Sequence, residues 1–103
     1  MSLLSSQSAA ASASFDPIRL KEPMSLWDLP TPALTIDVEA MEWNLRKMKT
    51  FYQGKKAKLR PHTKTHKCPI IAKRQMEDGA VGVCAAKVSE AEVMVEAGIG
   101  NVL

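Results

Sequence analysis

Short apolar strand patterns alternate with helical patterns from Pro32 onward, and this order constrains the fold more than any other feature of the chain. Ala33–Ile36 alternates as a short strand does, and residues 38–52 repeat apolar side chains at steps of three and four. Strands that alternate with helices form βαβ units around a parallel sheet. The sequence therefore predicts an α/β fold with right-handed crossovers.

The first predicted helix has signals at both ends. Asp37 precedes the apolar stripe and predicts an N-cap, because its carboxylate can accept a free backbone N–H of the first turn. Gly54 suits the left-handed conformation that ends many helices, so it predicts the position just after the C-cap. The stripe itself consists of Val38, Met41, Leu45, Met48 and Tyr52.

A second unit follows. Residues 58–64 predict a strand, and Pro69 fits the first position of a helix that continues to Asp78. Proline is favoured there because its missing N–H would have no helical acceptor in any case. Gly79 is expected to end this helix.

A third unit begins with the apolar strand pattern of residues 81–85. Ser89 and Glu92 have the spacing of a capping box and predict the start of another helix, which Gly98 ends. The expected apolar contacts of this helix are Ala91, Met94 and Val95. Residues 101–103 begin one more strand, and so few strands do not close a barrel. We therefore expect the 103 residues to be part of something larger.

Residues 1–24 differ from the rest in composition. The stretch from Met1 to Ser14 is mostly Ser and Ala, without charge or aromatic rings, and cannot bury enough apolar surface to offset the cost of ordering. We expect a disordered leader over 1–24 and one domain segment over 25–103. An organellar transit peptide is the alternative, although such leaders usually carry several arginines and Arg19 is the first here.

Composition argues against several classes of partner. The net charge is +3, from 14 basic and 11 acidic residues, and aromatic residues make up 5%, so we expect no nucleic-acid partner. No apolar run approaches the ~20 residues of a membrane helix, so we expect no membrane partner. Cys68 and Cys84 form no CxxC pair. They predict reduced thiols in a cytoplasmic protein.

The stretch from Arg60 to Lys67 carries the candidate chemistry, because it ends a predicted strand and ligands bind at such ends in parallel α/β folds. On a strand, His62, Lys64 and His66 would share one face. Partial desolvation lowers the pKa of a lysine and makes its amine a better nucleophile. The alternative interpretation is a solvated basic strand end that extends the lysines before it.

A metal site shared by His62 and His66 is a second alternative. Side chains four residues apart face one way on a helix, but on a strand they are separated by ~13 Å. Two ligands of one zinc ion each lie ~2 Å from the metal. Pro61 also disfavours a helix through His62. We therefore predict no metal site built by the two histidines together. One of them alone could still meet a metal or a phosphate, and the simpler interpretation is that each hydrogen-bonds to neighbouring backbone.

The run Arg-Pro-His-Thr-Lys-Thr-His-Lys over residues 60–67 resembles the cofactor-lysine motif of the D-threonine aldolase and D-serine dehydratase family. These are fold-type III pyridoxal-phosphate enzymes related to the alanine racemase N-terminal domain. Residues 28–34 resemble the opening segment of that family, and residues 79–82 and 89–92 resemble its next strand and helix. The resemblance covers residues 25–103 and implies the incomplete N-terminal part of a (β/α)₈ TIM-type barrel.

The same resemblance implies that Lys64 holds pyridoxal 5′-phosphate as a Schiff base, with Lys67 as the fallback and His62 and His66 as further cofactor contacts. It implies a lyase acting on a small-molecule D-amino acid. The first expectation is a D-threonine aldolase that forms glycine and an aldehyde, and the alternative is a D-serine dehydratase that forms pyruvate and ammonia. Family members form homodimers and use a divalent metal, whose ligands lie in later parts of their chains. We therefore expect an inactive fragment.

Two interpretations from other classes stay open. One is a small basic nucleic-acid-binding module, whose binding would depend on salt. It would use Arg46, Lys47, Lys49, Lys55, Lys56, Lys58 and Arg60. The other is a structural or regulatory fragment that associates with a longer paralogue through an exposed sheet edge.

Overall fold

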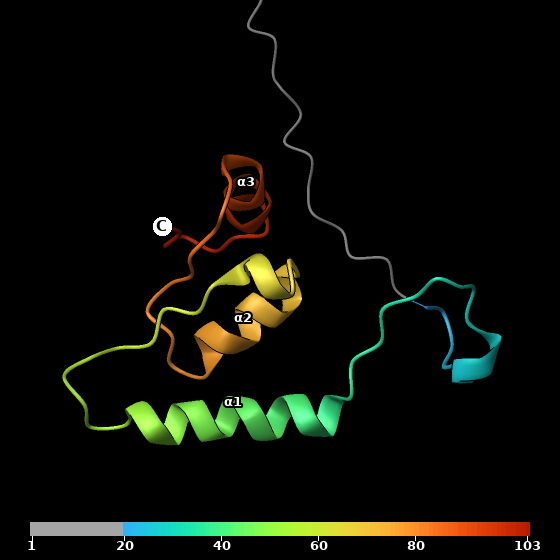
Figure 1. The fold of residues 1–103 in the computed structure, drawn as a ribbon, viewed down its shortest axis with the longest axis horizontal. Helices are drawn as coiled ribbons and strands as arrows, with labels where there is room; N and C mark the ends of the chain where they lie inside the picture. The colour runs from blue at the N-terminus through green and yellow to red at the C-terminus, as the bar shows by residue number, and fades with distance from the viewer. Residues whose placement is uncertain (1–19) are drawn as a thin grey trace, which may run out of the picture.

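A computed structural model describes residues 20–103 of the chain. In chain order its elements are η1 (Leu26–Asp28), α1 (Val38–Tyr52), η2 (Thr63–Thr65), α2 (Pro69–Glu77) and α3 (Val88–Glu96). Figure 1 shows α2 between α1 and α3, and residues 20–37 reaching away from the three helices. Most of the expected leader, residues 1–19, lies outside the described residues, and residues 20–24 are exposed.

The predicted ends of α1 are confirmed. The Asp37 carboxylate accepts the backbone N–H of Ala40 at 2.9 Å, as an N-cap does. Gln53 is the C-cap, and Gly54 follows it with a φ of 75°, the left-handed conformation that glycine adopts without steric cost. Local sequence signals were therefore sufficient to place this helix.

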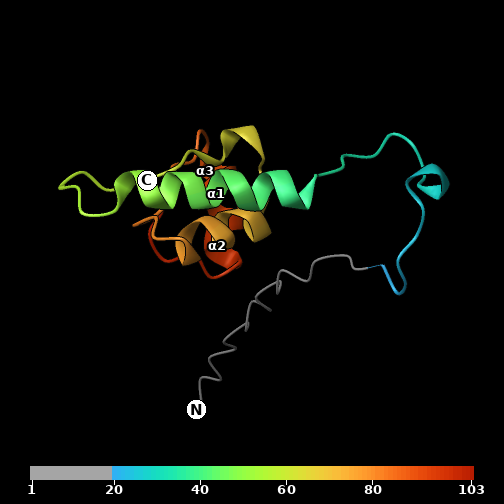
Figure 2. The same ribbon diagram turned by 90° about the horizontal axis from the view of Figure 1, so that it is seen from below.

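Helix α2 also begins and ends where the sequence predicts. Pro69 is its first residue, and Asp78 is its C-cap. Two ion pairs connect α2 to α1: Arg74 pairs with Glu42, and Lys49 Nζ lies 3.2 Å from an Asp78 carboxylate oxygen. These contacts hold α1 along one side of α2, as both ribbon views show (Figure 2).

The predicted capping box of α3 is wrong. The N-cap is Lys87, and Ser89 and Glu92 lie inside the helix and are exposed. The carboxylate that reaches back is that of Glu90, which accepts the Ala86 backbone N–H at 3.0 Å. The S-x-x-E spacing was present, but the helix begins at Val88, two residues earlier than a Ser89 cap requires, with Glu90 in contact with the preceding loop.

Three chain segments pair side by side in the parallel sense that the sequence predicts. His62 pairs with Cys84, and Val83 pairs with Val102. The described residues hold these isolated bridges and no longer strand. Pro61 gives a physical reason, because it accepts the Cys84 N–H at 2.8 Å but has no N–H to donate in return.

The register of the first pair also shifts by one residue. Val81 N–H donates to the Leu59 carbonyl, whereas Cys84 N–H donates to the Pro61 carbonyl. Three residues on one segment therefore oppose two on the other, which is the pattern of a β-bulge. The bulge interrupts the ladder between residues 81 and 84.

The predicted strand at Ala33–Ile36 is not formed. These residues have no ladder hydrogen bond in the described part of the chain, and Leu34 is 102% exposed. Strand propensity alone does not order a segment that has no neighbouring strand to pair with. The alternation at Leu34 and Ile36 is typical of a strand, but the prediction that this segment pairs with another strand was wrong.

A small core lies between the paired segments and the last two helices. It consists of Ala72, Val83, Met94 and Ile99, with Met76 and Val102 packed against it. Met94 is buried as predicted, but Val95 is 57% exposed and does not join this core. Within residues 20–103, no helix is long and apolar enough to cross a membrane.

Candidate functional site

The turn that carries Lys64 directly follows the paired segment that ends at His62. Its first residue, Thr63, has no exposed surface. The backbone N–H of Thr63 donates to the Cys84 carbonyl at 2.8 Å, and its hydroxyl donates to the same oxygen at 3.0 Å. This double contact fastens the start of the turn to the neighbouring segment.

The expectation that residues 58–64 form a strand is wrong at its C-terminal end. The Lys64 N–H donates to Nδ1 of His62 at 3.2 Å, and Thr63–Thr65 forms the 3₁₀ turn η2. The imidazole thereby takes a backbone donor that a continuing ladder would need. His62, Lys64 and His66 consequently do not share one strand face, and Lys64 follows the strand end instead of lying in the strand.

The two lysines of the motif have different surroundings. The Lys64 side chain is exposed, and its Nζ makes no hydrogen bond or ion pair with any residue from 20 to 103. Lys67 Nζ instead lies 3.2 Å from a carboxylate oxygen of Glu90. The amine that is free to react is therefore that of Lys64, the first lysine of the motif.

His66 serves the backbone of the turn. Its Nδ1 accepts the Cys68 N–H at 3.0 Å. Its Nε2 is buried and has no hydrogen-bond partner among the described residues, and neither has the side-chain oxygen of Gln75. Burial lowers the pKa of His66, and its contact with Gln75 opposes that shift in part.

No metal centre is found in the part of the chain that the structure describes: no three His, Cys, Asp or Glu side chains there come together to hold an ion. His62 and His66 are each engaged by a backbone N–H through Nδ1. This role as hydrogen-bond acceptors of the local backbone is the one the sequence left open for each histidine alone.

Sequence reasoning missed a cluster around Arg60. Its guanidinium donates to the Asn101 side-chain oxygen at 2.9 Å and to the Val83 carbonyl at 3.4 Å, and so spans all three paired segments. Gly82 makes room for this crossing, because a Cβ there would lie 2.6 Å from the Asn101 carbonyl oxygen. The glycine inside an apolar strand pattern was the available signal, since such glycines often mark a close backbone approach.

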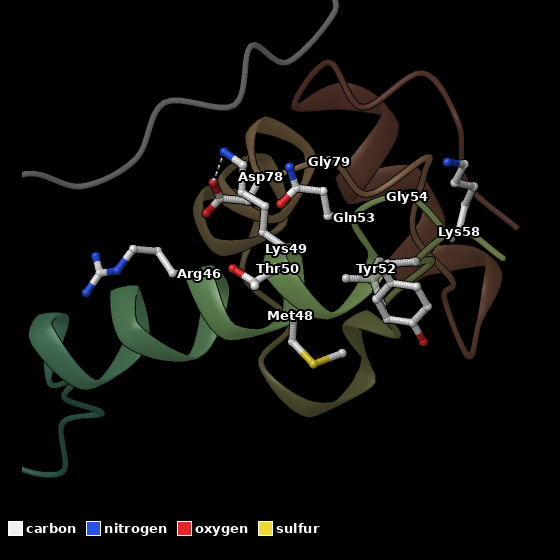
Figure 3. A pocket seen from close by; sticks show the side chains of 11 residues that line it. Arg46, Met48, Lys49, Thr50, Tyr52, Gln53, Gly54, Lys58, Asp78 and Gly79 are labelled. Carbon is white, nitrogen blue, oxygen red and sulfur yellow. Dashed lines mark hydrogen bonds and ion pairs between the residues drawn. The ribbon is translucent and has the colours of Figure 1, made fainter. Parts of the chain in front are cut away.

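A hollow of about 530 Å³ lies away from Lys64. Figure 3 shows its lining, which includes Tyr52, Gly54, Lys58 and Asp78. These residues belong to the C-terminal ends of α1 and α2 and to the beginning of the first paired segment. Ligands of parallel α/β folds bind at the opposite, C-terminal ends of the strands, which is where Lys64 lies.

Comparison with known proteins shows a relationship over most of the described chain. Residues 36–103 match the family model of the alanine racemase N-terminal domain. D-threonine aldolase from Arthrobacter sp. is 44% identical over 86 residues, which is 84% of this chain and 22% of that protein.

Solved structures show the same relationship in three dimensions. The crystal structure of D-threonine aldolase from Filomicrobium marinum is 61% identical, with a TM-score of 0.70, and the match covers 75% of this chain and 21% of that one. A metal-free mutant of D-threo-3-hydroxyaspartate dehydratase is 34% identical, with a TM-score of 0.72 over 78% of this chain and 21% of the dehydratase. The chain thus spans about a fifth of the length of the relatives it matches.

The motif, the parallel pairing and these similarities agree with one another. The matched family segment begins at Ile36, just before α1, and includes the Lys64 turn and both later helices. The chain therefore belongs to the alanine racemase N-terminal domain family.

Proposed function

We propose that this chain supplies the cofactor lysine of a pyridoxal-phosphate-dependent lyase that acts on D-3-hydroxy amino acids, and that the lysine is Lys64. The observation that carries the proposal is a free, exposed amine just beyond the end of a parallel-paired segment, while the neighbouring Lys67 is engaged by Glu90. When bound, pyridoxal 5′-phosphate supplies an electron sink for charge that develops at the substrate Cα.

The residues around Lys64 fit such a group. Lys64 would hold the cofactor through its amine, which no described side chain occupies. Thr63 keeps the turn attached to Cys84, and His62 orients the Lys64 backbone through its Nδ1. The His62 Nε2 is left for a ligand, whereas the His66 imidazole accepts the Cys68 N–H through its Nδ1 and its Nε2 is buried. We extend the proposed cofactor contacts to His62 on this basis.

We also propose that residues 25–103 form the first units of a (β/α)₈ barrel. The three parallel-paired segments with helices between them support this arrangement. Such a barrel has ~250 residues. The remaining strands, the phosphate-binding loops and the ligands of a divalent metal would come from other parts of such a polypeptide. We therefore expect the 103 residues to bind the cofactor but not to turn over substrate.

A covalent trapping experiment tests the site. The chain is mixed with pyridoxal 5′-phosphate, reduced with borohydride and digested, and peptide mass spectrometry locates the pyridoxyl group. We expect it on Lys64. Lys64→Ala should abolish the trapped product and Lys67→Ala should not. Loss of the product in Lys67→Ala alone would show that the second lysine of the motif is the cofactor residue.

Aldol cleavage is the proposed reaction, because the relatives named aldolases are the more similar ones, at 44% and 61% identity against 34% for the dehydratase. Backbone similarity does not distinguish the aldolase from the dehydratase, since their TM-scores to this chain are 0.70 and 0.72. The dehydratase compared above is named for 3-hydroxyaspartate, whereas the alternative expected from the sequence was a D-serine dehydratase.

Two chimeras distinguish the reactions. Residues 36–103 would replace the matching segment either in the Arthrobacter D-threonine aldolase or in the 3-hydroxyaspartate dehydratase. We expect the aldolase chimera to release glycine from D-threonine and to lose this activity on Lys64→Ala. Better retention of activity in the dehydratase chimera, measured as ammonia released, would favour the dehydratase assignment.

A further inference from the structure

The end of the Lys64 turn, like its beginning, is fixed by contacts with other residues. Lys67 has a φ of 49°, a left-handed conformation that costs a residue with a Cβ roughly 1–2 kcal/mol. Its backbone N–H donates to the Thr63 carbonyl at 2.7 Å. This closes the turn around Lys64, and the Lys67 side chain reaches the first turn of α3, where it meets Glu90.

Glu90 is itself anchored. One carboxylate oxygen accepts the Ala86 backbone N–H at 3.0 Å, and the other lies 3.2 Å from Lys67 Nζ. The Glu90 side chain is 13% exposed, although that of Lys67 is 64% exposed. The Ala86 N–H and, after it, Lys67 lower the pKa of Glu90. The carboxylate therefore connects the loop before α3 to the last residue of the turn.

We propose that Glu90 and Lys67 are positioning residues that hold the Lys64 turn against the segment from residue 84 to residue 90, which leads into the first turn of α3. The proposal rests on the proposed role of Lys64 and adds how its amine is kept in place. The turn is then fastened to one neighbouring segment at both ends, by Thr63 on Cys84 and by Lys67 on Glu90.

The alternative is an ordinary exposed ion pair, which contributes little to stability or to order. Two features argue against it here. The carboxylate is mostly covered and is fixed by a backbone donor, so it loses little conformational freedom on pairing. The pairing also coincides with a backbone conformation at Lys67 that needs support from its surroundings.

The test compares Glu90→Gln with Glu92→Gln in the full chain. Gln at position 90 keeps the size of the side chain and an oxygen for the Ala86 N–H, but removes the charge that meets Lys67. Glu92 is an exposed acid of the same helix. Two readouts are taken: the rate at which pyridoxal 5′-phosphate with borohydride labels Lys64, and the rate at which acetic anhydride modifies Lys67.

We expect Glu90→Gln to lower the Lys64 labelling rate and to raise Lys67 acetylation, each about twofold to fivefold, the range set by partly exposed ion pairs. Glu92→Gln should leave both rates unchanged. A rise in Lys67 acetylation with unchanged Lys64 labelling would overturn the positioning role, as would a Glu90→Gln variant identical to Glu92→Gln. Absence of Lys64 labelling in the unmodified chain would instead overturn the proposed function, with the acetylation rates still reporting whether the ion pair exists.

A second pair of variants covers the case in which Glu90→Gln fails to fold. Lys67→Arg keeps a cation for Glu90, and Lys67→Met keeps the length of the stem without charge. Lys67→Arg should label Lys64 at the rate of the unmodified chain, and Lys67→Met should label it about twofold to fivefold more slowly. Equal rates in these two variants would contradict the proposal.

Discussion

Two lysines three residues apart in one motif have different surroundings in the folded chain. Lys64 follows the strand end with a free amine, and Lys67 turns into the left-handed region and meets Glu90. The resemblance of the motif implied Lys64 as the cofactor lysine, with Lys67 as the fallback. The contacts of the folded chain add a physical reason for the same preference.

We expect His66 to make the stability of the chain sensitive to weak acid. Burial lowers its pKa from the ordinary value of 6.5, so the unfolded chain takes up a proton at this ring before the folded chain does. Its contribution to stability is therefore complete above pH 6.5 and is lost as the pH falls toward the lower folded pKa. We expect the urea concentration at the unfolding midpoint to decrease as the pH is lowered from 7.5 to 5.5.

The matched variants are His66→Gln and His62→Gln. His66→Gln removes the buried titrating ring, so its urea midpoint should change less over the same pH interval. His62→Gln changes the histidine that caps the Lys64 turn and should keep the pH dependence of the unmodified chain. A His66→Gln variant with undiminished pH dependence would assign the effect to another group.

Among the elements, helix ends decide how well local signals work. The Asp37 carboxylate bonds to the Ala40 N–H, whereas Ser89, the cap predicted for α3, lies in the first turn and makes no capping bond. Asp37→Ala should therefore destabilise the chain by about 0.5–2 kcal/mol. Ser89→Ala should change the unfolding free energy by less than about 0.5 kcal/mol, because alanine is the better helix former.

Urea unfolding followed by circular dichroism at 222 nm measures both free energies. The two substitutions remove a hydroxyl or a carboxylate of similar size from the start of a helix, so each serves as the control for the other. A loss of stability in Ser89→Ala equal to that in Asp37→Ala would mean that the serine caps α3 after all.

At the scale of the whole molecule, a few buried side chains hold the last two helices to the paired segments. Met94 is 1% exposed in this core, and its neighbour Val95 is 57% exposed on the same helix. Met94→Ala should cost about 2–5 kcal/mol, a large share of the stability of so small a unit. Val95→Ala should cost less than about 1 kcal/mol. Thermal unfolding of the two variants side by side would show the difference, and comparable losses would contradict this location of the core.

The same small core leaves much apolar surface in contact with water. Trp27, Leu34 and Leu103 are 92%, 102% and 78% exposed. The last of these ends the outermost paired segment, whose other edge has no neighbour among residues 20–103. Surface of this kind is suited to further packing partners, in agreement with a segment that spans about a fifth of its relatives.

The sequence by itself determined the helices, their order and the motif. The helix signals act over a few residues, so they could be identified without knowing the tertiary contacts. They are the periodic apolar residues, the aspartate cap, Pro69 and the helix-ending glycines. Parallel pairing also followed from the alternation of strands and helices, since only a crossover can join parallel neighbours.

The tertiary structure decided what depends on distant residues. Ala33–Ile36 has strand composition but no neighbour, so it stays unpaired. The paired segment before Lys64 ends at His62 because the imidazole nitrogen of His62 accepts the Lys64 N–H. The Arg60–Asn101 and Lys67–Glu90 contacts join residues more than twenty positions apart. No local pattern encodes such contacts, because they exist only when the βα units are assembled.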